Sequence, residues 1–184
     1  MPDFLIPDPI RIQQYRDNMD FNGSLLEVGT GSGILAKIAL EQGADPVVAI
    51  DINPCAVANA KRLAAGAMVF ESDLFSSVDG RFDNIVFAAP WSEGEIKKPL
   101  DYAIYDNGVV ARFLSEAASY LNDNGKIWLQ YCDAFPNNFN RLSHWISEGG
   151  FEIEQEWRYQ TWGQLVRREV NVILYKLVRK GQAQ

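Results

Sequence analysis

Short apolar runs alternate along the chain with longer segments in which apolar residues recur every three or four positions. Continuous apolar runs are typical of strands buried on both faces of a sheet, and the longer spacing is typical of helices with one buried face. The pattern predicts strands over residues 24–28, 46–50, 67–70, 82–88 and 126–131, and helices over residues 34–42, 54–65, 108–121 and 137–148. Because strands separated by crossover helices pair in parallel, we expect an α/β fold with helices on both faces of the sheet.

The pattern changes toward both ends of the chain. Residues 151–159 and 168–177 are both strand-like, and a connection of about eight residues is too short for a parallel crossover. These segments therefore predict an antiparallel pair at one edge of the sheet. Residues 8–19 predict a helix ahead of the first strand, and we expect this helix to lie across the mouth of a site at the strand ends.

Composition restricts the class of protein. The 184 residues are 47% hydrophobic and 22% charged, which is typical of one globular domain. Cys55 and Cys132 lie far apart, with no Cys-x-x-Cys spacing and no histidine cluster, so we expect reduced thiols and no metal site. No apolar run approaches the roughly 18 residues of a membrane span, and the first ten residues contain no basic side chain. We therefore expect a cytoplasmic protein without a signal peptide or anchor.

The distribution of charge bears on possible partners. The net charge of −7 disfavours a large phosphate-binding surface, so we do not expect nucleic acid as a partner. From Arg158 onward, however, six basic residues accompany only Glu169. A solvated edge strand and a contact with an acidic partner are both compatible with this local excess.

The most distinctive motif follows the first predicted strand. Residues 27–33 read Glu-Val-Gly-Thr-Gly-Ser-Gly, and this spacing differs from the Gly-x-Gly-x-x-Gly of dinucleotide sites. Glycines at alternate positions allow a tight turn and let a ligand approach the backbone where a Cβ would collide. We therefore expect a ligand to bind at this loop, and its candidate contacts are Glu27, Gly29, Thr30, Gly31 and Gly33.

Two carboxylates follow the next two predicted strands. Asp51 ends the second strand, where nucleoside sites of this architecture place a carboxylate that accepts hydrogen bonds from both ribose hydroxyls. Asp73 follows the third strand, where it can accept a hydrogen bond from an adenine amino group while Leu74 packs against the ring. A helix cap is the alternative role for Asp51, although Asn53 already fills that position, and a solvated loop is the alternative for Asp73.

Together these segments resemble the class I S-adenosylmethionine-dependent methyltransferases, from about Asp8 to Leu177. The resemblance implies a Rossmann-like sheet of seven mostly parallel strands, with helices on both faces and an antiparallel C-terminal strand pair. It implies a single domain over residues 1–184, in which residues 1–22 cover the cofactor site and residues 23–180 form the core. It also implies S-adenosyl-L-methionine as the cofactor, with the glycine loop at its methionine portion and Asp51 at its ribose. Asp73 and Leu74 would flank the adenine, and Ile52 and Ala89 would also contact the cofactor.

Within this class, the chain most resembles the release-factor glutamine methyltransferases and the related small-domain methyltransferases. Residues 105–108 and 112–117 are similar to their helix after the fourth strand, and residues 5–7 are similar to their segment before the glycine loop. Those enzymes carry Asn/Asp-Pro-Pro-Tyr/Phe where this chain has Ala88-Ala89-Pro90-Trp91. The first residue of that motif accepts hydrogen bonds from the nitrogen to be methylated, and Ala88 has no side-chain acceptor. Unless a backbone carbonyl substitutes, the sequence does not favour a planar amide or base nitrogen as the methyl acceptor.

The segment before the glycine loop has a second resemblance. Residues 8–19 are similar to the helix that protein arginine methyltransferases fold over their cofactor. An arginine that matches Arg11 there pairs with the cofactor carboxylate, which suits the two-pronged guanidinium group. The twin-glutamate loop of those enzymes is not reproduced, although Glu93 and Glu95 follow Trp91. Arginine is therefore an alternative acceptor rather than the expected one.

Methyl transfer requires mainly that the acceptor be held in line with the methyl–sulfur bond. We expect Trp91, Tyr105 and Tyr131, near the ends of the fourth and fifth strands, to wall an acceptor pocket; core packing is the alternative. The function hypothesis is an S-adenosylmethionine-dependent methyltransferase that acts on a protein or peptide, with nitrogen as one candidate for the accepting atom. We expect a monomer or a homodimer. A small-molecule methyltransferase, a catalytically silent cofactor-binding scaffold and an NAD-dependent oxidoreductase are the alternatives.

Overall fold

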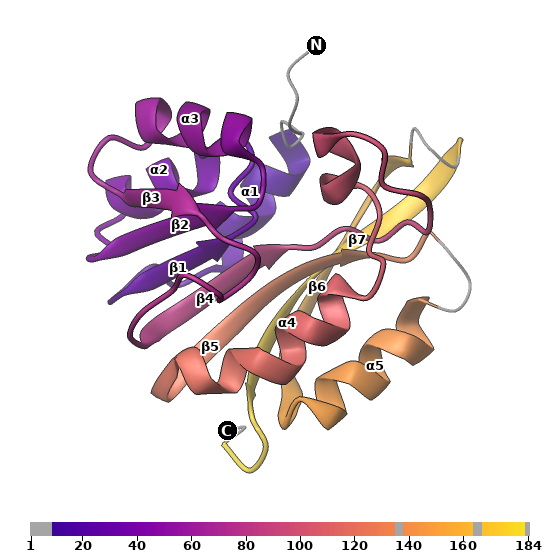
Figure 1. Ribbon diagram of the computed structural model, residues 1–184. Coiled ribbons are helices and arrows are strands. Elements are labelled where there is room, and N and C mark those ends of the chain that lie inside the picture. The colour runs from indigo at the N-terminus through magenta and orange to yellow at the C-terminus, as the bar shows by residue number, and fades with distance from the viewer. Residues whose placement is uncertain (1–8, 135–137, 164–166, 183–184) are drawn as a thin grey trace.

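A seven-stranded sheet forms the centre of the computed structural model, which describes residues 9–134, 138–163 and 167–182. Its strand order is β3-β2-β1-β4-β5-β7-β6 (Figure 1). The strands are β1 (Leu25–Val28), β2 (Val47–Asp51), β3 (Met68–Glu71), β4 (Phe82–Ala88), β5 (Leu121–Cys132), β6 (Phe151–Gly163) and β7 (Arg168–Arg179). The first five strands pair in parallel, whereas β7 pairs antiparallel with both β5 and β6. The predicted fold class, with its antiparallel C-terminal pair, is confirmed.

Helices cover both faces of the sheet (Figure 1). They are α1 (Pro9–Asn18), α2 (Ile34–Glu41), α3 (Pro54–Leu63), α4 (Val109–Ala117) and α5 (Asn138–Glu148), with short 3-10 helices η1 (Pro99–Ala103) and η2 (Ala118–Tyr120). Side chains of α1, α2 and α3 contribute to one buried apolar cluster, and those of α4 and α5 contribute to the other. Burial on both faces explains why the central strands read as continuous apolar runs. No helix in the described part of the chain is long and apolar enough to cross a membrane.

The largest departure from the predicted elements lies between α4 and β5. The sequence predicts a helix to residue 121 and a strand from residue 126, but α4 ends at Ala117 and β5 begins at Leu121. The guanidinium group of Arg179 donates hydrogen bonds to the carbonyl oxygens of Ala118, Leu121 and Asn122, at 2.8, 2.9 and 2.6 Å. These contacts come from a residue distant in sequence, and local pattern therefore could not predict them.

Gly33 shows how the glycine loop also serves packing. Its φ is +80°, and a Cβ at this position would lie 2.6 Å from the Cα of Ala60 in α3. The absence of a side chain therefore allows α2 to begin directly against α3. Gly43 has a comparable φ of +96°, but no atom would lie within 4 Å of its added Cβ.

We predict that Gly33→Ala lowers the free energy of unfolding by about 2–4 kcal/mol, because it adds a backbone clash to the cost of a positive φ. The matched control Gly43→Ala incurs the positive-φ cost alone and should lose only about 1 kcal/mol. Urea denaturation of both variants measures the difference. Equal losses would show that close approach to Ala60 is not what requires glycine at position 33.

Candidate functional site

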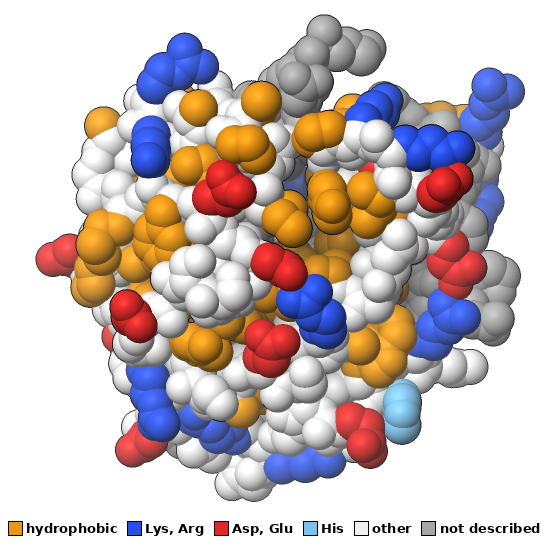
Figure 2. All heavy atoms as spheres, viewed as in Figure 1, with side chains coloured by type: hydrophobic (Ala, Val, Ile, Leu, Met, Phe, Trp, Pro, Cys, Tyr) orange, Lys and Arg blue, Asp and Glu red, His pale blue; other side chains and the backbone are white. Residues whose placement is uncertain are grey.

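A cavity of about 690 Å³ opens at the carboxyl ends of the parallel strands. Figure 2 shows the hollow in this face, with hydrophobic side chains at its rim. Its lining comes from α1, the loop after β1 with α2, the end of β2, the loop after β3, the segment from the end of β4 to α4, β5 and the β6–β7 hairpin. Ligands of open parallel sheets bind in this position, so the cavity is the candidate site.

The loop after β1 forms one wall of the cavity. Gly29 and Gly31 have φ values of +67° and +52° and both line the cavity, as does Thr30. These left-handed conformations favour glycine and leave the backbone open to a ligand. Gly33, by contrast, is not part of the cavity lining.

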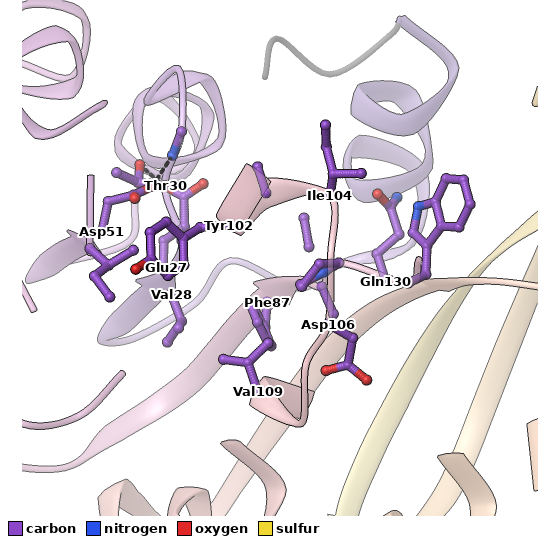
Figure 3. A pocket seen from close by; sticks show the side chains of 18 of the residues that line it. Glu27, Val28, Thr30, Asp51, Phe87, Tyr102, Ile104, Asp106, Val109 and Gln130 are labelled. Atoms are coloured by element: carbon purple, nitrogen blue, oxygen red, sulfur yellow. Dashed lines mark hydrogen bonds between the residues drawn. The ribbon is translucent and has the colours of Figure 1, made fainter. Parts of the chain in front are cut away.

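The side chain of Glu27, labelled in Figure 3, stabilises this loop through hydrogen bonds. Its Oε2 accepts hydrogen bonds from the hydroxyl of Thr30 at 2.7 Å and from the backbone N–H of Ala36 at 3.0 Å. Because the side chain is buried, desolvation raises the pKa of Glu27 to about 8. At neutral pH the carboxyl group therefore holds a proton while it lines the cavity.

Asp51 joins the end of β2 to the same loop. Its two carboxylate oxygens accept hydrogen bonds from the backbone N–H groups of Gly31 at 2.8 Å and Asn53 at 2.9 Å. Burial raises the pKa of Asp51. The cap of α3 is Asn53, which accepts from the N–H of Cys55 at 2.9 Å, so Asp51 is not the helix cap. Asp51 and Ile52 both line the cavity.

The loop after β3 forms the adjoining wall. Leu74 is buried at a φ of +48°, and Asp73 beside it forms an ion pair with Arg112 of α4 at 3.1 Å. All three residues line the cavity. Both side chains of this ion pair are about half exposed, so Asp73 lines the cavity from a solvated position.

Helix α1 contributes another part of the cavity wall. Arg11 and Tyr15 lie one turn apart on this helix and both line the cavity. Tyr15 is only 4% exposed, and no described residue forms a hydrogen bond with its hydroxyl. A buried hydroxyl without a partner is costly, so this position favours a polar ligand group next to it.

Aromatic side chains also belong to the lining of the cavity. Trp91 and Tyr105, both expected from the sequence, line it, together with Tyr102 and Trp162. Tyr102 is 45% exposed and Trp162 is 61% exposed, so these two rings lie at the rim. Ala89 also lines the cavity.

Tyr131 is the expected pocket residue that the structure does not bring to the cavity. Its side chain is 3% exposed and belongs to the buried cluster beneath α4 and α5, so its position matches the core-packing alternative. Sequence reasoning missed Tyr15, Gln130 and Trp162, which reach the cavity from α1, β5 and the terminal hairpin. Tyr15 lies in the segment that resembles the arginine methyltransferase helix, where only Arg11 was expected at the cofactor, whereas the places of Gln130 and Trp162 depend on how distant elements pack.

The chain belongs to the methyltransferase small domain family, which it matches over residues 12–153. It is thus a domain of the S-adenosylmethionine-dependent methyltransferase class, and the alternative of an NAD-dependent oxidoreductase is wrong. The resemblance to the release-factor glutamine methyltransferases and the small-domain group is confirmed.

Three curated relatives and one solved structure show the range of similar proteins. A Methanocaldococcus jannaschii protein with the provisional name protein N5-glutamine methyltransferase is 38% identical over 119 residues, 58% of this chain and 60% of the relative. The release factor glutamine methyltransferase of Streptococcus pneumoniae is 30% identical over 132 residues, 62% of this chain and 47% of the relative. The ribosomal RNA small subunit methyltransferase C of Erwinia tasmaniensis is 29% identical over 144 residues, 71% of this chain and 39% of the relative. The matches therefore span at most 60% of these relatives.

The solved structure shares the fold. Ribosomal protein L11 methylase of Lactobacillus delbrueckii subsp. bulgaricus has a TM-score of 0.72 at 22% identity, over 97% of this chain and 83% of that one. Its similarity covers nearly the whole chain, which includes the antiparallel terminal strands.

The residues at the cavity fit S-adenosylmethionine. The open backbone at Gly29 and Gly31 leaves room for a ligand, and Asp51 offers a carboxylate beside them. The hydroxyl of Tyr15, which has no hydrogen-bond partner among the described residues, lies in the same lining as Arg11, and this pair suits the carboxylate of an amino acid.

The raised pKa of Glu27 implies that the free energy of unfolding depends on pH. Between its ordinary value of 4.5 and about 8, the folded protein keeps a proton that the unfolded chain has lost. This proton favours the folded state at low pH, and its contribution disappears as the pH rises through 8. The free energy of unfolding of the cofactor-free protein should therefore fall between pH 5 and pH 9, by an amount on the order of 3 kcal/mol from this group.

Glu27→Gln should reduce this loss, because the amide keeps an oxygen acceptor but does not titrate. Urea denaturation at pH 5, 7 and 9 measures the effect, with the exposed Glu148→Gln as the matched control. If Glu27→Gln loses as much stability with pH as the control does, Glu27 does not hold a proton in the folded protein.

Proposed function

We propose that this domain transfers a methyl group from S-adenosylmethionine to a nitrogen of a protein or peptide. The observation that carries the proposal is one cavity whose lining contains two chemically different sets of residues. The glycine loop and Asp51 form one set, and Trp91 and Tyr105 belong to the other. A donor at the first set and an acceptor at the second would share one cavity, and the proximity of two bound reactants accounts for a large part of the rate of a group transfer.

In this proposal, each part of the cofactor contacts a different segment of the cavity lining. The backbone of Gly29, Thr30 and Gly31 would lie against the methionine portion, and Asp51 with Ile52 would hold the ribose. Arg11 and Tyr15 would bind the carboxylate of the methionine portion. Asp73, Leu74 and Ala89 would contact the adenine.

S-adenosylmethionine supplies an electrophilic methyl group on a positively charged sulfur. The side chains of this protein would align the acceptor and exclude water around that methyl group. The faces of Trp91 and Tyr105 attract cations and apolar groups alike, so these rings suit a position beside the acceptor and the positively charged sulfur.

Three observations support a protein acceptor. Two large aromatic side chains, Tyr102 and Trp162, lie exposed at the rim, and exposed aromatic side chains beside a cavity are typical of protein-binding surfaces. The net charge of −7 is unfavourable for a long RNA contact. The names of two of the three relatives above specify glutamine in proteins, whereas the third specifies ribosomal RNA.

Replacement of Asp51 tests the cofactor half of the proposal. Asp51→Ala should weaken S-adenosylmethionine binding by at least about 10²-fold, because it removes a charged acceptor of two ribose hydrogen bonds. Isothermal titration calorimetry measures the affinity, and the exposed Asp79→Ala serves as the control. Unchanged affinity in Asp51→Ala would show that the nucleoside binds elsewhere.

The acceptor class is tested by locating a transferred methyl group. The purified protein is incubated with methyl-labelled S-adenosylmethionine and a cell extract, and the products are treated with protease or with ribonuclease before precipitation. We expect precipitable label that protease releases and ribonuclease does not. Label released by ribonuclease would identify RNA as the acceptor, and label that never precipitates would identify a small molecule. Cofactor binding without any transferred label would favour a non-catalytic scaffold.

A further inference from the structure

The side chain next to Ala88 on the neighbouring strand is Gln130. The parallel register of β4 and β5 pairs Ala88 directly with Gln130, and paired residues of neighbouring strands point to the same face of a sheet. Both residues line the cavity. The hydrogen-bond acceptor that Ala88 lacks is therefore present one strand away.

A chain of buried amides fixes the orientation of Gln130. The Nε2 of Gln14 in α1 donates to the carbonyl oxygens of Trp157 in β6 and Val172 in β7, at 2.9 and 3.2 Å. Both protons of the Gln14 amide are thus used, and its Oε1 is left as an acceptor. The Nε2 of Gln130 donates to that oxygen at 2.7 Å.

This series of hydrogen bonds turns the carbonyl oxygen of Gln130 away from Gln14. Figure 3 shows the side chain rising from β5 with its oxygen on the side of Ile104 and the cavity. No described residue donates a hydrogen bond to this oxygen. Gln14 and Gln130 are 0% and 2% exposed, so the amide is held in one direction while its oxygen faces the cavity.

We propose that Gln130 takes the place of the missing motif side chain: its Oε1 accepts a hydrogen bond from the nitrogen that is to be methylated. The proposal rests on the function proposed above and narrows its acceptor to a nitrogen that carries a proton, such as a side-chain amide of a protein. A hydrogen bond from that N–H to Gln130 sets the direction of the nitrogen lone pair, and this orientation restores an amide nitrogen as an acceptor despite Ala88.

Gln130 orients the acceptor and exchanges no proton with it. The new bond forms from the nitrogen lone pair to the methyl carbon, and the carbon–sulfur bond breaks with its electrons on sulfur. The proton displaced from the nitrogen passes to water. An amide oxygen is too weak a base to hold that proton, so its contribution is alignment of the acceptor.

The central variant is Gln130→Met, which keeps the length of the side chain and removes its whole amide, the oxygen together with the Nε2 donor to Gln14. We expect protein labelling to fall by about 10²-fold while S-adenosylmethionine affinity stays within about twofold of wild type. Gln155→Met makes the same change at an exposed position of β6 and should transfer label like the wild type. Thermal unfolding and calorimetry on each variant report whether it is folded and binds the cofactor.

Rescue separates an orienting role from a structural one. In the Gln130→Met background, Ala88→Asn returns an acceptor to the strand that carries it in related enzymes, and it should restore labelling by about tenfold or more. The labelled product should release methylamine on acid hydrolysis, as an N-methyl amide does. A base-labile methyl ester would overturn the proposal, as would full labelling by Gln130→Met, which would leave the function itself intact. Absence of rescue by Ala88→Asn would also count against the orienting role.

A binding measurement keeps the two proposals distinguishable. The probe is N-acetyl-glutamine N-methylamide, added to the protein loaded with S-adenosylhomocysteine, and the readout is the side-chain amide signal of Gln130 in a nitrogen-15 NMR spectrum. We expect the probe to shift this signal in the wild type and to bind Gln130→Met more weakly. If wild type labels no protein and the signal still shifts, the proposed function fails while the role of Gln130 stands. If the probe leaves the signal unchanged, the role of Gln130 is overturned.

Discussion

The reversal of strand order between β1 and β4 is the constraint on which the site depends. β2 pairs with one side of β1 and β4 pairs with the other, so the connections that leave the two strands diverge. Their divergence opens a crevice at the carboxyl ends of the sheet. The shape of the crevice then depends on local hydrogen bonds, among which the contact between Asp51 and the N–H of Gly31 ties the end of β2 to the loop after β1. The cavity therefore results from the topology, and the polar residues at its edge refine it.

The local sequence pattern was sufficient to predict most of the fold, because strands buried on both faces are continuous runs of apolar residues. It was insufficient where a long-range contact decides the backbone, as at the start of β5, where Arg179 binds four carbonyl oxygens. The site divides in the same way. The glycine loop and Asp51 lie at fixed distances from one strand end and could be predicted, although Gly33 in that motif serves the contact between two helices. Tyr15 and Gln130 reach the cavity only through tertiary packing, and Tyr131 alternates away from it into the core.

Several polar groups at the cavity are held in conditions that reduce stability. Glu27 is buried without a cation among its described contacts, and the hydroxyl of Tyr15 has no hydrogen-bond partner within the described residues. Apolar residues of similar size would avoid both costs. Polar groups in such positions are typical of sites that are preorganised for a ligand, since the ligand completes the missing interactions.

The hydrogen bonds from Gln14 to β6 and β7 connect α1 with strands that are synthesised 143 and 158 residues later at the bonded positions. During synthesis on the ribosome, α1 cannot dock at this place until Val172 has left the exit tunnel. Until then the cavity lacks its α1 wall. A nascent chain would consequently acquire this wall in a step that follows the synthesis of β7, after the glycine loop and Asp51 have already been made.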